Sequence, residues 1–193
     1  SNGKSIGVID QRVLPHQLKS HLIHTCEEAE NAIQTMIVRG APLIGVTGAY
    51  GLMLALQKDP SDKNLEAAFK QLISARPTAI NLAWALNRVK KNIETLPPRD
   101  RAEKAKKESQ SIAEEDVSMC EAIGEHGLKI IEHIYINRPE YKKDKPLNIL
   151  THCNAGWLAT VDWGTALAPI YKAHRAGLNI HVWVDETRPR NQG

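Results

Sequence analysis

The pattern of apolar and polar positions divides the 193-residue chain into a long helical part and a short α/β part. Two strand-like segments open the chain, SIGVID and roughly LKSHLIHT. Apolar residues then recur at helical spacing as far as about residue 136. Caps and breakers place the helix starts at Thr25, Pro42, Ser61, Pro77–Thr78 and about Arg99. The first helix is expected to end at Arg39–Gly40, and Cys120 in the last helix is interpreted as core packing.

The character of the chain changes after residues 139–146 (PEYKKDKP), which are polar, bounded by prolines and interpreted as a linker. A strand at Leu147–Thr151, a helix at Gly164–Ala176 and a strand at Asn179–Val184 follow, which is one βαβ unit of a parallel sheet. The predicted fold class is therefore α/β, with a mostly helical domain at 1–138 and an α/β domain at 139–193. Two parallel strands with one crossover helix bury too little apolar surface to stand alone, so we expect a truncated chain and an incomplete second domain.

Composition excludes several classes of function. A net charge of +3 is too small to indicate nucleic-acid binding, and the basic run Arg99–Lys107 also contains acids, so it is interpreted as a solvated helix face. No apolar run reaches the length of a membrane span. The three cysteines lack the spacing of a secreted disulfide scaffold and the N-terminus lacks a signal region, which favours a reducing cytoplasm.

The segment LTHCNAG places Cys153 where an apolar strand stops and a glycine-containing turn begins. The carboxyl ends of neighbouring parallel strands open onto one crevice, so Cys153 and Asn154 should meet the residues after the second strand, from Asp185 to Gln192. A thiol, amides, carboxylates and guanidinium groups on one rim favour a polar small-molecule site. Neighbouring strand residues point to opposite faces, which disfavours a His152–Cys153 dyad, and the histidine spacing gives no metal site.

The segment VRGAPLIG is a second candidate. Gly40 permits close backbone approach, Pro42 fixes a helix start, and free helix amides beside Arg39 attract an anion such as phosphate. The alternative is a tight helix–helix turn with a surface arginine. Arg76, before Pro77, is another basic residue beside a predicted helix start, which makes a phosphorylated ligand more plausible.

Together, VIDQRVLP, VRGAPLIG, SARPTAINLAWAL, LTHCNAGWLAT and VDETRPRNQG resemble the methylthioribose-1-phosphate isomerase family, which shares its fold with the regulatory subunits of translation initiation factor 2B. The resemblance covers nearly the whole chain. It implies a Rossmann-like second domain, a homodimer, no cofactor, and interconversion of 5-methylthioribose 1-phosphate and 5-methylthioribulose 1-phosphate in methionine salvage.

Carried over residue by residue, the resemblance makes Cys153 the catalytic thiol. Substrate contacts would come from Arg39, Gly40, Ala41 and Arg76, mainly to phosphate, and from Gln192 to the sugar. Members of the family continue past QG and carry a catalytic aspartate there, so the 193 residues alone are expected to have little activity. Two alternatives stay open: a related substrate such as 5-deoxyribose 1-phosphate, and a non-catalytic regulatory protein of the same fold.

Overall fold

The computed structural model describes residues 3–140 and 143–187 and has an α/β fold that separates into two compact units, Ser1–Glu115 and Asp116–Gly193. Unit 1 contains the following elements: β1 (Ile6–Ile9), β2 (Ser20–Ile23), α1 (Cys26–Gln34), α2 (Ala41–Lys58), α3 (Asp62–Ser74), α4 (Ile80–Ile93) and the first part of α5 (Pro98–Ile136). Unit 2 contains the rest of α5 and β3 (Leu147–Thr151), the short 3₁₀ helix η2 (Trp157–Ala159), α6 (Ala168–Arg175) and β4 (Ile180–Val184).

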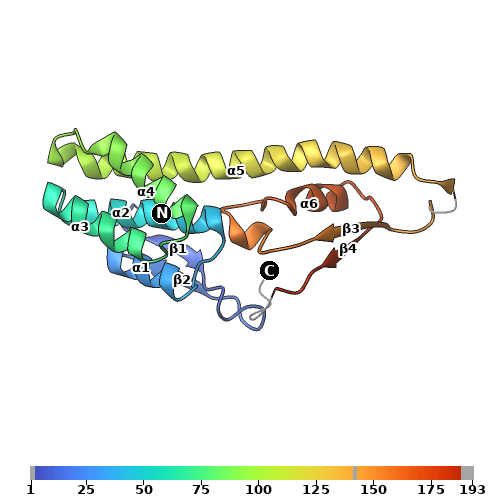
Figure 1. Cartoon of the computed structure of the whole chain (residues 1–193), viewed down its shortest axis with the longest axis horizontal. Coiled ribbons are helices and arrows are strands. Elements are labelled where there is room, and N and C mark those ends of the chain that lie inside the picture. The colour runs from blue at the N-terminus through green and yellow to red at the C-terminus, as the bar shows by residue number, and fades with distance from the viewer. Residues whose placement is uncertain (1–2, 141–142, 188–193) are drawn as a thin grey trace. The chain divides into compact units, whose positions relative to one another are not determined.

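The division between the units falls inside α5, which is continuous in Figure 1. The composition changes later, after residue 138, where the sequence places the domain boundary. The reason is that the C-terminal part of α5 packs within unit 2. A Cβ added at Gly127 would lie 2.3 Å from Pro169 Cγ, and one at Gly124 would lie 2.8 Å from Lys172 Cε, so α5 and α6 approach closely at these glycines. Packing therefore divides the chain earlier than composition does.

Helix α2 is the centre of unit 1 and contacts α1, α3 and α4. Its own residues are buried almost throughout, from Ile44 to Leu56, because apolar side chains surround the whole helix. The neighbouring helices contribute the remaining large buried side chains, among them Ile33, Leu72, Leu82, Leu86 and Val89. The strands β1 and β2 form an antiparallel pair in which Ile6 lies opposite Ile23, as the two opening strand segments predicted.

The predicted caps at Thr25 and Ser61 are confirmed, because their side chains accept hydrogen bonds from Glu28 N and Asn64 N. Three predicted helix limits are wrong. Helix α1 ends at Gln34 rather than at Arg39–Gly40, because Met36 has a φ of 61° and the chain leaves the helix there. The other two errors are late starts: α4 begins at Ile80 instead of Pro77–Thr78, and α6 begins at Ala168 instead of Gly164, whose φ is 72°.

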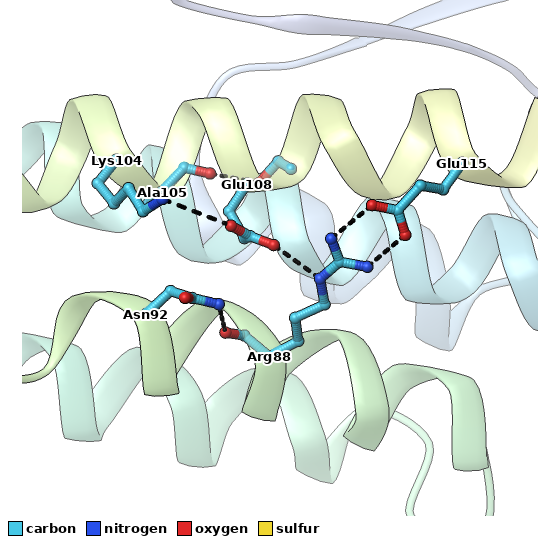
Figure 2. Close-up of polar contacts among 7 residues, drawn as sticks. Arg88, Asn92, Lys104, Ala105, Glu108 and Glu115 are labelled. Carbon is cyan, nitrogen blue, oxygen red and sulfur yellow. Dashed lines mark hydrogen bonds and ion pairs between the residues drawn. The ribbon is translucent and has the colours of Figure 1, made fainter.

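Helices α4 and α5 are joined by an arginine that binds two carboxylates (Figure 2). Arg88 donates from Nε to Glu108 at 2.6 Å and from its two terminal nitrogens to Glu115 at 2.5 and 2.6 Å. The two carboxylates raise the pKa of Arg88, and Arg88 in turn lowers the pKa of Glu115. A guanidinium that pairs bidentately with one acid and binds a second fixes the distance between the two helices.

The basic run at the start of α5 is not solvated throughout. Arg101 is 4% exposed, and its guanidinium donates to the backbone oxygens of Leu96 at 2.9 Å and Pro60 at 3.0 Å. It also pairs with Asp62 at 2.7 Å. The interpretation of Arg99–Lys107 as a solvated helix face is therefore wrong at Arg101, whose five donors suit the free carbonyls between helices.

Candidate active site

The carboxyl ends of β3 and β4 meet, as the βαβ pattern predicted. The strands are parallel, with Leu147 opposite Ile180 and Thr151 opposite Val184. One further ladder bond lies beyond the strands, where Asp185 N donates to Thr151 O at 3.2 Å. β-Branched and apolar residues dominate both strands, which favours this pairing. The backbone after β3 and the backbone after β4 therefore lie on one rim of the two-stranded sheet.

Cys153 lies on this rim, two residues after the end of β3. It is the exposed cysteine of the three, whereas Cys26 and Cys120 are buried, and none of them forms a disulfide. Burial raises the pKa of Cys26 to about 12 and that of Cys120 to about 11, so neither is a ready nucleophile. The interpretation of Cys120 as a core residue is confirmed, because its side chain is buried. The accessible thiol of the chain is thus the one that sequence reasoning selected.

The backbone around Cys153 is unusual. Cys153 has a φ of 74° and Gly156 has a φ of 106°. A residue with a Cβ in the left-handed region costs roughly 1–2 kcal/mol, so the surrounding structure must enforce this conformation. The chain then turns through η2 and returns to Gly164, which contacts the backbone of Gly156 closely. The thiol therefore stands at the start of a tightly folded loop.

His152 pairs with Asp185 across the rim. Its Nδ1 lies 3.1 Å from Asp185 Oδ2, and both side chains are exposed. This contact joins the residue before the thiol to the first residue after β4. The sequence pattern places Asp185 among the rim residues and disfavours His152 as a partner of Cys153, but it does not indicate a His152–Asp185 pair. The parallel register, which places Thr151 beside Val184, was the signal that could have found it.

A pocket with a volume of about 400 Å³ lies in unit 2, lined by Trp157, Asp162, Trp163, Tyr171 and Arg175. The Trp163 ring is covered by two cations, with Lys172 Nζ 4.2 Å and Arg175 Cζ 4.8 Å from its centroid. Lys172 also pairs with Glu125 of α5. Sequence reasoning named none of these residues, because they come from a loop and a helix face that meet only in the folded unit.

Arg39, Gly40 and Ala41 lie in unit 1 at the start of α2. Gly40 is the residue before the helix and has a φ of 101°, a value that favours glycine, and proline stands in the first turn. Two backbone bonds hold the approach to this turn: Gln11 N donates to Ile37 O at 3.0 Å, and Val38 N donates to Ala32 O at 3.2 Å. The predicted start of α2 is confirmed.

Arg39 itself is 8% exposed. The alternative interpretation, a tight helix–helix turn with a surface arginine, is therefore wrong about the exposure of Arg39. A buried guanidinium next to a glycine turn and the amino end of a helix is a favourable environment for a bound anion.

Arg76 lies in the turn between α3 and α4 and is half-buried. Its carbonyl accepts a hydrogen bond from Ala79 N at 3.0 Å. Because α4 begins at Ile80, Arg76 is further from the helix start than the sequence indicated. Arg39 and Arg76 thus belong to unit 1 and Cys153 to unit 2, and Gln192 lies outside the described residues.

Residues 3–140 and 143–187 contain neither a metal-binding cluster nor a membrane-spanning helix. In that part of the chain no group of three or more His, Cys, Asp and Glu side chains could hold a metal ion. Over the same residues, no helix has the length and apolarity needed to cross a membrane.

Comparison with known proteins gives a consistent result. The sequence profile of the initiation factor 2 subunit family matches residues 37–193. Methylthioribose-1-phosphate isomerase of Rhodospirillum centenum is 54% identical over 193 residues, which are 100% of this chain and 50% of that protein. Methylthioribose-1-phosphate isomerase of Methylocella silvestris is 58% identical over 192 residues, which are 100% of this chain and 52% of that protein.

Two crystal structures resemble the fold. That of 5-methylthioribose 1-phosphate isomerase from Pyrococcus horikoshii OT3 matches with a TM-score of 0.82 and 37% identity, covering 98% of this chain and 52% of that one. That of translation initiation factor eIF-2B, subunit delta, from A. fulgidus matches with a TM-score of 0.76 and 36% identity, covering 98% and 56%. The chain spans about half the length of the relatives that it matches.

Proposed function

The chain belongs to the initiation factor 2 subunit family, and within that family we propose that it is part of an aldose–ketose isomerase. The reaction is the conversion of 5-methylthioribose 1-phosphate into 5-methylthioribulose 1-phosphate, a step of methionine salvage. The observation that carries the proposal is the identity of 54% and 58% to two methylthioribose-1-phosphate isomerases over the whole of this chain. An exposed thiol on the strand rim supports the same activity.

The chemistry of the substrate explains why such a thiol would be needed. A phosphate on the anomeric carbon prevents the easy ring opening on which ordinary aldose isomerases depend. An acid must therefore protonate the ring oxygen before hydrogen moves between carbon 1 and carbon 2. In the proposal Cys153 contributes to this proton transfer, and its accessibility supports that role, since the buried Cys26 and Cys120 cannot reach a ligand.

Arg39, Gly40 and Ala41 are proposed to hold the phosphate. Support comes from the buried guanidinium of Arg39 and from the glycine turn that leads into α2. An arginine and free helix amides bind a phosphate dianion through charge-assisted hydrogen bonds. Arg76 is proposed as a second cation for the same group, and Gln192 as a contact to the sugar. These five assignments and the homodimer follow from the family resemblance. A cytoplasmic location is also proposed, and it is supported by three cysteines that form no disulfide.

A non-catalytic role is the second candidate, because the chain also resembles subunit delta of an initiation factor, with a TM-score of 0.76. Identity supports the isomerase, because it is 54% and 58% to the Rhodospirillum centenum and Methylocella silvestris isomerases. The two crystal structures do not differ in this respect, since the isomerase is 37% identical and the subunit 36%. The low activity expected of the 193 residues alone stays a prediction.

The test is a turnover assay of the native protein with 5-methylthioribose 1-phosphate, 5-deoxyribose 1-phosphate and ribose 1,5-bisphosphate, measuring the ketose formed. We expect turnover with the highest kcat/KM for the methylthio sugar. A higher kcat/KM for 5-deoxyribose 1-phosphate would make that sugar phosphate the proposed substrate. Absence of ketose from all three would contradict the isomerase and favour the regulatory candidate.

A further inference from the structure

A carboxylate of helix α5 binds the backbone of the loop after Cys153. Asp116 Oδ2 accepts a hydrogen bond from the backbone N–H of Val161 at 2.8 Å, between residues 45 positions apart in the chain. Asp116 is half-buried, and burial raises its pKa above the ordinary value. The thiol of Cys120, which is 2% exposed, lies 3.9 Å from Asp116 Oδ1. A carboxylate in such partly dry surroundings makes a strong bond to a backbone amide.

The loop that Asp116 holds is closed on itself. Thr160, which is 3% exposed, accepts a hydrogen bond from Gly164 N at 3.0 Å and donates to Asp162 O at 2.9 Å. A Cβ added at Gly164 would lie 2.0 Å from the carbonyl carbon of Gly156, so the two ends of the loop are in backbone contact. A loop with this much internal bonding moves as one body, and an anchor at Val161 therefore also restrains Gly156.

Gly156 stands only three residues after Cys153, and both have left-handed backbone angles, 106° and 74°. The conformation at Cys153 is unfavourable by roughly 1–2 kcal/mol for a residue with a Cβ, so it needs support from the structure around it. The closed loop 156–164 follows Cys153 closely in the chain, and the bond from Val161 to Asp116 ties it to α5. Cys120 of α5 also forms a side-chain hydrogen bond with Thr160 of this loop.

We propose that Asp116 is a positioning residue for Cys153: by binding the Val161 amide it fixes the closed loop 156–164 and, through that loop, the direction in which the thiol is presented. The inference rests on the proposed isomerase function. Asp116 forms no bond to the substrate in this account. Its contribution is geometric, since displacement of a catalytic group by about 1 Å can cost roughly 100-fold in rate.

Three variants separate this role from a general effect on stability. Asp116→Ala removes the acceptor, whereas Asp116→Asn keeps an oxygen that can accept from Val161 N and removes only the charge. Glu114→Ala is the matched control, because Glu114 is an exposed acid two positions earlier on the same helix. All three are made in the native protein and compared at equal folded fraction.

In Asp116→Ala, kcat for 5-methylthioribose 1-phosphate should fall about 10- to 100-fold while KM changes by less than about 3-fold, because the chemical step is affected more than binding. Asp116→Asn should retain most of kcat, and Glu114→Ala should match the unmodified protein. Amide hydrogen exchange supplies a readout without turnover: the Val161 and Gly164 amides should be protected in the unmodified protein and exchange at least about 10-fold faster in Asp116→Ala.

A folded Asp116→Ala protein with unchanged kcat would overturn the proposal. If that variant does not fold, two other results decide. A Val161 amide that exchanges as fast as an open peptide in the unmodified protein would overturn it, as would Asp116→Asn losing activity while Val161 stays protected. Protection of Val161 together with an active Asp116→Asn would support it. Absence of isomerase activity in the unmodified protein would instead contradict the proposed function. Amide hydrogen exchange does not depend on that activity, so the two failures can be distinguished.

Discussion

Unit 1 and unit 2 are stabilised by different kinds of interaction. Every one of the largest fully buried side chains, from Ile23 to Ile93, lies in unit 1. In unit 2 the buried apolar residues are mainly small, whereas large ones such as Met119, Ile130 and Trp183 are exposed. The fold of unit 1 is therefore stabilised mainly by apolar packing. The fold of unit 2 depends more on close backbone contacts at glycines and on individual hydrogen bonds. Cys153, the candidate catalytic thiol, lies in unit 2. We expect the loss of one hydrogen bond to displace the backbone more in unit 2 than in unit 1.

The same contrast exists between two neighbouring carboxylates at the boundary of the units. Glu115 is exposed and its ion pair with Arg88 lowers its pKa. Asp116 is half-buried, and desolvation raises its pKa. One acid therefore stabilises the fold by being charged, while the other is held in place by hydrogen bonding at a cost to its charged form.

Truncation of a core side chain should give the largest effect on stability. Leu52 is fully buried in α2, so Leu52→Ala should lower the free energy of unfolding by about 2–5 kcal/mol. Ile130, which is 63% exposed in unit 2, is the comparison, and Ile130→Ala should cost less than about 0.5 kcal/mol. Chemical denaturation measures both. Equal losses would contradict the division of the molecule into a packed and a sparsely packed unit.

The second prediction concerns two glycines of unit 2 with nearly the same backbone angle. Gly164 has a φ of 72° and Gly177 a φ of 76°, but a Cβ at Gly177 would meet nothing within 4 Å. Gly177→Ala should therefore cost only the strain of the left-handed conformation, about 1 kcal/mol. Gly164→Ala should cost about 3 kcal/mol, because its Cβ would also collide with Gly156. Similar melting temperatures for the two variants would show that the backbone contact in the loop is not tight.

The smallest effects are those of pH on the two neighbouring acids. The pKa of Glu115 is lowered from its ordinary 4.5, so its stabilisation is present above about pH 4.5 and lost as the pH falls through the folded-state value. The advantage of the unmodified protein over Glu115→Gln, at most about 1 kcal/mol for a half-exposed pair, should disappear in acid.

Asp116 should have the opposite sign. Its pKa is raised from 3.8, so its contribution is fully present below that pH and lost as the pH rises through the folded-state value. Relative to Asp116→Asn, the unmodified protein should become less stable as the pH rises from 3.8. Unfolding curves over this pH range measure both differences, and slopes of the same sign for the two acids would refute the assignment.

Local signals in the sequence predicted much of the fold. Thr25 and Ser61 cap their helices because side-chain oxygens next to free backbone amides act locally. The parallel pairing of β3 and β4 followed from their apolar pattern and from the helix between them. The end of α1 was missed because the apolar stripe continues to Ile37, although the backbone turns at Met36.

The candidate site was predicted only in part. Cys153 was found because it stands where a strand ends, a local feature. The contact of Asp116 with Val161 joins distant parts of the sequence, and no spacing rule indicates it. The pair of His152 with Asp185 could have been found only from the register of the two parallel strands. The close approach of α6 at Gly124 and Gly127 is likewise a tertiary feature, since glycine in a helix otherwise indicates only lower helix propensity.

Turnover of 5-methylthioribose 1-phosphate by Cys153→Ser decides whether Cys153 is the catalytic thiol of an isomerase. Cys26→Ser is the matched control at a buried cysteine. We expect kcat to fall by about 100- to 10,000-fold in Cys153→Ser, with an unchanged far-ultraviolet circular dichroism spectrum. Cys26→Ser should keep most of kcat when compared per folded molecule. A Cys153→Ser protein as active as the unmodified one would show that Cys153 is not the catalytic thiol.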